Sequence, residues 1–140
     1  MDRFSYVKNE VNVVPAIAAV TTTTTSNAIL VAGAKAIGLE VYSEAVSETQ
    51  DRAGNFKITV SMDGGTTFRD YNMLLSNVTN SNEQNLTRVA TLALTEGSEQ
   101  NAIAWLDPKT LGAITHIKVV FTRTTEGTKG TFTSNVSVAY

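Results

Sequence analysis

Hydrophobic and polar residues alternate along most of the chain. The clearest run is residues 56–60, where every second side chain is apolar, and a further alternating run follows at residues 71–75. A period of two is typical of strands with one buried face. Asp63-Gly64-Gly65 lies between the runs, and its glycines allow positive φ at little steric cost. We predict a β-hairpin here.

Similar runs predict strands along the rest of the chain. Their apolar positions share one parity, which should face the core. The segment 101–106 fits either a strand or a helical turn, and we favour a strand. The expected strands are 28–32, 36–47 (Ile37, Leu39 and Val41 inward), 86–95, 101–106, 114–124 (Ile117, Val119 and Phe121 inward) and 131–140 (Phe132, Val136, Val138 and Tyr140 on one face).

This pattern predicts an all-β domain of about eight or nine short antiparallel strands. Strands spaced by about ten residues, with turns of Gly, Asn and Asp, are typical of a β-sandwich or jelly roll. We assign residues 27–140 to the sandwich and residues 1–26 to an extended N-terminal arm that contains five successive threonines. Residues 76–85 are almost wholly polar and predict a long interaction loop.

Composition narrows the classes of function. The net charge is −2 and only 17% of the 140 residues are charged, which argues against an electrostatic grip on nucleic acid or membrane. The chain has no cysteine, and its first residues lack the pattern of a secretory signal. We expect a protein made in the cytoplasm, with no membrane and no nucleic acid among its partners.

Candidate chemistry is sparse. His116 is the only histidine, and no GxSxG turn accompanies it, so we expect no enzyme and no cofactor. Asp63 and Asp70 beside the glycine-rich turn could hold calcium, but no D-x-D-x-D-G loop is present. A glycosidase would need a carboxylate pair, for which the chain offers three glutamates spaced four apart; we interpret them as an acidic strand face: Glu40, Glu44 and Glu48.

Trp105 is the only tryptophan, and it decides between two interpretations. It lies between Ala104 and Leu106, and we predict that it is buried in the core. A carbohydrate-binding module would instead need Trp105 exposed, together with Tyr42 or Tyr71. A carbohydrate-binding module or adhesin domain is our alternative to a structural role.

The turn after residue 60 resembles the Asp-box, Ser-x-Asp-x-Gly-x-Thr followed by Trp or Phe. The resemblance covers eight residues, and all fixed positions match: Ser61, Asp63, Gly65, Thr67 and Phe68. In proteins that carry it, the motif shapes a β-hairpin, with the Asp and Ser or Thr bonding loop backbone. A single copy implies a structural device and not a sialidase.

As a whole, the chain resembles small virion proteins of tailed bacteriophages, particularly head decoration (cement) proteins. The features behind this are the N-terminal arm, the Thr- and Asn-rich surface, the absence of cysteine and the hairpin of residues 61–68. The resemblance implies a homo-oligomer, often a trimer, that lies on the virion and binds the major capsid protein or another virion protein. The residues expected to bind these partners are Phe4, Tyr6, Val11, Val13, Thr21, Thr22, Thr23, Thr24, Thr25, Asn77, Asn80 and Asn82.

Overall fold

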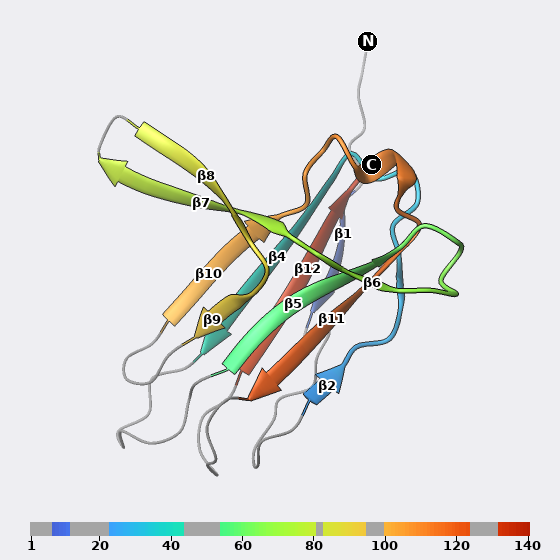
Figure 1. Cartoon of the computed structure of the whole chain (residues 1–140), viewed down its shortest axis with the longest axis horizontal. Coiled ribbons are helices and arrows are strands. Elements are labelled where there is room, and N and C mark those ends of the chain that lie inside the picture. The colour runs from blue at the N-terminus through green and yellow to red at the C-terminus, as the bar shows by residue number, and fades with distance from the viewer. Residues whose placement is uncertain (1–6, 12–22, 44–53, 81–82, 95–99, 124–131) are drawn as a thin grey trace.

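A computed structural model describes residues 7–11, 23–43, 54–80, 83–94, 100–123 and 132–140. These residues form twelve strands and one short 3-10 turn, η1 (Leu111–Ala113), in a two-layered antiparallel β-sandwich (Figure 1). The all-β sandwich predicted from the sequence is therefore confirmed, with more and shorter strands than expected. No helix in the described part of the chain is long and apolar enough to cross a membrane.

The first sheet contains six strands in the order β1-β12-β4-β10-β7-β8. Each strand pairs antiparallel with its neighbours. Among the described strands, β1 and β8 lie at the edges of this sheet. The bounds are β1 (Val7–Val11), β12 (Phe132–Ala139), β4 (Ala36–Ser43), β10 (Gln100–Trp105), β7 (Met73–Asn80) and β8 (Glu83–Val89).

The second sheet is built around β11 (His116–Arg123) and β5 (Gly54–Ser61), which pair along their whole length. Short strands lie end to end along the outer edge of each. Along β11 these are β2 (Thr23–Thr25) and β3 (Ile29–Leu30), and along β5 they are β6 (Arg69–Tyr71) and β9 (Leu92–Leu94). The predicted hairpin is confirmed, because β5 pairs with β6 from Ile58 to Val60.

The core lies between the sheets. Phe121 of β11 is part of it, with its ring centroid 4.8 Å from the centroids of Phe56 of β5 and Phe132 of β12, so the three rings join the two layers. The strands alternate buried and partly exposed positions as predicted, because each has one face on the core. Ten side chains were named above as facing inward or sharing one face, and all but Tyr140 are buried. Tyr140 is partly buried and packs against the core cluster. The nine buried ones are Ile37, Leu39, Val41, Ile117, Val119, Phe121, Phe132, Val136 and Val138.

The prediction of a loop at residues 76–85 is wrong. Its described residues, 76–80 and 83–85, belong to strands β7 and β8, with Ser76 opposite Leu86 and Asn77 opposite Asn85. The neighbouring strand β10 reaches β7 only at Leu74 and Leu75. Beyond that point the two strands, among the described residues, pair only with each other and project from the sandwich as a ribbon (Figure 1). We call residues 76–80 and 83–86 the β7–β8 ribbon.

Two parts of the expected arm join the sheets of their own chain. β1 pairs with β12 along the edge of the first sheet, and β2 pairs with β11 along the edge of the second. Both edges lie on the same side of the sandwich (Figure 1). The remaining arm residues, 1–6 and 12–22, lie outside the described residues.

Candidate functional site

The β5–β6 turn is organised by two side chains. The Ser61 hydroxyl donates to Asp63 Oδ1 at 2.7 Å and accepts from the backbone N–H of Gly65 at 2.9 Å. Asp63 Oδ1 also accepts from the N–H groups of Thr66 and Thr67, at 3.2 and 2.8 Å. Gly64 and Gly65 have φ of 78° and 91°, which favours glycine over residues with a side chain. The hydrogen bonds, led by the Thr67 N–H and then the Ser61 hydroxyl, lower the pKa of Asp63 to about 2.

The same turn is tied to the start of β11. Thr115 accepts a hydrogen bond from the Gly64 N–H and donates one to the Ser61 carbonyl. His116 is half-buried, and a Cβ built on Gly65 would lie 3.4 Å from the Cγ and Nδ1 atoms of its ring. The ammonium of Lys118 lies 4.3 Å from the ring centroid of Phe68, within the range of a cation–π contact. These contacts fix the loop on the sheet.

The acidic residues considered as metal ligands have separate partners. Asp63 binds its own loop, whereas Asp70 Oδ1 accepts from Lys57 Nζ at 2.9 Å. Within the described ranges, no group of three or more His, Asp or Glu side chains is placed to hold a metal ion. Of the glutamates considered for catalysis, Glu40 hydrogen-bonds Asn135, and Glu44 and Glu48 lie outside the described residues. Of these acidic side chains, those in the described part of the chain each have a separate hydrogen-bond partner.

Trp105 is not buried in the core, so that prediction is wrong. Its side chain is 44% exposed on the outer face of the first sheet. The physical reason is the register: Ala104 and Leu106 face the core, so the residue between them faces outward. Opposite Trp105 on β4 lies Gly38, and a Cβ built there would be 2.8 Å from Trp105 Cζ3. The indole thus lies over the glycine, which explains why outward-facing Gly38 is itself covered.

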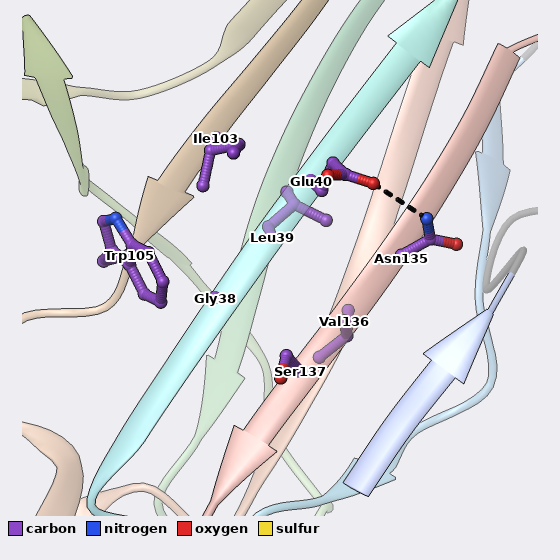
Figure 2. Close-up of a pocket in the computed structure, with 8 residues that line it drawn as sticks. All are labelled: Gly38, Leu39, Glu40, Ile103, Trp105, Asn135, Val136 and Ser137. Carbon is purple, nitrogen blue, oxygen red and sulfur yellow. Dashed lines mark hydrogen bonds between the residues drawn. The ribbon is translucent and has the colours of Figure 1, made fainter. Parts of the chain in front are cut away.

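A shallow depression of about 380 Å³ lies beside Trp105 (Figure 2). It is formed by the three adjacent strands β12, β4 and β10. Asn135 Nδ2 donates to Glu40 Oε1 at 3.1 Å across its floor. The eight lining residues are Gly38, Leu39, Glu40, Ile103, Trp105, Asn135, Val136 and Ser137.

The two tyrosines weighed with Trp105 have different surroundings. Tyr42 is half-buried on the outward face of β4, two positions beyond Glu40. Tyr71 belongs to the second sheet, where its hydroxyl accepts from the Asp107 N–H at 2.8 Å and lies 2.7 Å from Thr110 Oγ1. Tyr71 is therefore not part of the depression.

Sequence reasoning missed the network that holds the base of the β7–β8 ribbon. Arg88 of β8 donates to Asp107 Oδ2 at 2.8 Å, and Asp107 Oδ1 accepts from the Lys109 N–H at 3.0 Å. The Lys109 N–H, followed by the Arg88 guanidinium, lowers the pKa of Asp107. Nothing in the sequence pairs Asp107 with Arg88, which lies 19 residues earlier in the chain.

The residues expected to bind partners fall into two groups. The described ones lie on strands: Val11 on β1, Thr23, Thr24 and Thr25 on β2, and Asn77 and Asn80 on β7. The structure does not gather them into one site, since β2 belongs to the second sheet and β1 and β7 to the first. The others lie outside the described residues: Phe4, Tyr6, Val13, Thr21, Thr22 and Asn82.

Comparison with known proteins adds a likeness of fold. No protein-family model matches the chain, and no curated protein matches it in sequence. Among solved structures, the crystal structure of the SPBc2 prophage-derived protein YomS is similar, with a TM-score of 0.60. The match covers 100% of this chain and 98% of that one at 8% identity. The two proteins share a fold over their whole length.

Proposed function

We propose that this protein is a structural component of a tailed-phage virion, of the capsid decoration type, that acts by self-association. The prophage origin of YomS, which has the same fold over its whole length, supports the phage setting. We infer the mode of action, self-association, from which strands lie at the edges of the first sheet. In the described part of the chain, the first sheet ends in β1 on one side and β8 on the other. β1 lies in the arm, and β8 begins within residues 76–85, so both edges involve segments that the sequence marked for partner contact.

Edge strands present unpaired backbone N–H and C=O groups, and adding a strand from a neighbour satisfies them. The β7–β8 ribbon needs such a neighbour, because a two-stranded hairpin alone is only marginally stable in water. A contact between β1 of one copy and β8 of the next is head-to-tail, and contacts of this type close into rings when the rotation permits. We favour a ring of three copies bound to the major capsid protein or another virion protein.

The test shortens the ribbon without touching its base. Replacing residues 78–84 by Asn-Gly keeps the Asn77–Asn85 pair and closes it with a two-residue turn. The expected result is a folded monomer, whereas the parent chain is an oligomer by size exclusion with light scattering. Arg88 and Asp107 remain, so far-UV circular dichroism should report an unchanged fold.

A second variant makes the test directional. Deleting residues 1–25 removes β1 and β2 and should also give a folded monomer. The ribbon-shortened variant still has β1, and the deletion variant still has the complete β8. If the assembly is head-to-tail, β1 of the first can pair with β8 of the second, so a mixture should form a one-to-one dimer. If the variants stay oligomeric alone, or do not associate when mixed, the proposed contact is wrong. Mass spectrometry of purified virions tests the location: absence of the protein from the particles refutes the decoration role.

The alternative function is carbohydrate binding, and the exposure of Trp105 favours it. A carbohydrate-binding module needs an exposed aromatic side chain, and Trp105 meets this requirement. Titration with glycan should then quench the fluorescence of this single tryptophan. An emission unchanged by any glycan would remove the alternative and leave the assembly role untouched.

A further inference from the structure

The outer face of the first sheet carries an ordered array of side chains. Residues of β12, β4 and β10 lie opposite one another in two rows. One row reads Ser137, Gly38, Trp105, and the next reads Asn135, Glu40, Ile103. All six share the outward parity, because Val136, Leu39 and Ala104 between them face the core.

The β10 side of this array is apolar. Trp105 and Ile103 are 44% and 45% exposed, and they lie two residues apart on one strand face. Both line the depression, and the indole edge carrying Cζ3 and Cε3 rests on Gly38. A glycine at this point keeps the floor of the depression low beside the ring. Figure 2 shows Trp105 and Ile103 on β10, at one side of the strand that carries Gly38 and Glu40.

The β4 and β12 side is polar. Asn135 holds the Glu40 carboxylate through the 3.1 Å hydrogen bond, which positions both groups above the sheet. An ionised carboxylate has about four lone-pair sites, and this bond uses one of them. Ser137 adds a hydroxyl in the next row. Of the eight described lining residues, Glu40 is the one that carries a charge.

We propose that the depression binds a neutral sugar ring of an oligosaccharide or polysaccharide. A pyranose has an apolar C–H face, which packs on an aromatic ring, and a rim of hydroxyls, which bond carboxylate, amide and hydroxyl groups. Trp105 and Ile103 take the apolar face, and Glu40, Asn135 and Ser137 take the hydroxyls. A volume of about 380 Å³ is within the usual range of small-ligand sites. The carboxylate of Glu40 repels uronate and other anionic sugars, so selectivity for neutral sugars follows.

Tryptophan fluorescence can be used to follow binding at this site, because Trp105 is the only tryptophan of the chain. The experiment titrates the full chain with cellohexaose, laminarihexaose, maltohexaose and mannohexaose, and with oligogalacturonate as the anionic comparison. At least one neutral oligosaccharide should change the Trp105 emission saturably, and oligogalacturonate should not. The proposal is overturned if none of the four gives a saturable change up to about 10 mM, or if only the anionic sugar does.

Variants measured by isothermal titration calorimetry separate the two halves of the site. Trp105→Ala should weaken binding about tenfold or more, because the stacking surface is lost. Glu40→Gln should weaken it about threefold to tenfold, because a charged hydrogen-bond acceptor becomes neutral. The matched control is Met62→Ala, since Met62 is 66% exposed but lies outside the depression, and it should bind as the parent does.

Trp105→Phe guards against loss of structure, because it keeps an aromatic ring and should retain partial affinity. Equal affinity of parent and Trp105→Ala would refute the site even if a sugar binds elsewhere. The proposal does not depend on self-association: the ribbon-shortened variant keeps every lining residue and should bind sugar as the parent does. Loss of assembly and loss of sugar binding are thus read in separate measurements.

Discussion

The ring of Phe121 leaves no room for a side chain at Gly54, the first residue of β5. We therefore predict that adding one methyl group there, as in Gly54→Ala, destabilises the fold. A Cβ built on Gly54 would clash with Phe121 Cε2 and would lie 2.7 Å from Phe121 Cζ. Real Cβ contacts are not this short, so either the ring or the strand must move. The ring has no room, because Phe121 is fully buried with Phe56 and Phe132 centroids each 4.8 Å away. Gly54→Ala therefore overpacks the core around Phe121.

Overpacking of this kind typically costs about 1–3 kcal/mol. We expect Gly54→Ala to lie near the upper end, about 2–3 kcal/mol, because the clash involves two ring atoms held between two other rings. For a chain of this length each kcal/mol shifts the melting temperature by roughly 4 °C. The midpoint should thus fall by roughly 10 °C.

The assay is urea unfolding followed by far-UV circular dichroism. Gly112→Ala is the matched control, since a Cβ there meets nothing within 4 Å, and its free energy of unfolding should stay within about 0.5 kcal/mol of the parent. Phe121→Leu removes the ring atoms that meet the new methyl. The double variant Gly54→Ala/Phe121→Leu should therefore be more stable than the sum of the two single effects, by about 0.5–3 kcal/mol.

Two outcomes would refute this reasoning. If Gly54→Ala unfolds at the same urea concentration as Gly112→Ala, the ring and glycine are not in the contact described. If the effects of Gly54→Ala and Phe121→Leu simply add, the cost of the first has another origin, such as the backbone conformation of residue 54.

Two further predictions concern the β5–β6 turn and Trp105. Asp63 has a folded-state pKa of about 2 against an ordinary 3.8, so its stabilising contribution is fully present above pH 4–5 and is lost as pH falls towards 2. Acid titration of stability should show this loss, and Asp63→Asn should flatten it; an equal acid dependence in both proteins would contradict the hydrogen bonding described. Gly38→Ala should push the indole off the sheet, because the new methyl would lie 2.8 Å from Cζ3. Its emission should shift to the red and acrylamide should quench it more strongly, whereas an unchanged spectrum would mean that Trp105 does not rest on Gly38.

Alternation of apolar residues predicted the central strands well. Strands β5, β11 and β12 each bury one face, so every second residue of these strands must be apolar to pack in the core. The β5–β6 turn could also be predicted, because the positive φ at residues 64 and 65 favours glycine, and glycine is found at both positions.

The β7–β8 ribbon could not be predicted in this way. Its paired segments project past β10 and do not pack on the core, so they need no alternating apolar residues. The polar residues 76–85 were therefore predicted to be a loop. Trp105 could have been placed correctly, since the inward parity of Ala104 and Leu106 sends it outward. The residues beside Trp105 in the depression could not be predicted. Trp105 meets Gly38, and Glu40 meets Asn135, only because of the strand order and register between segments far apart in the sequence.

The measurement that tests the proposed self-association most directly is the molar mass of the full chain in solution, by size exclusion with light scattering. The subunit mass is 15.0 kDa. The account predicts a species of three times that mass, and the subunit mass for the variant in which Asn-Gly replaces residues 78–84. A full chain that stays at the subunit mass up to its highest soluble concentration would contradict it.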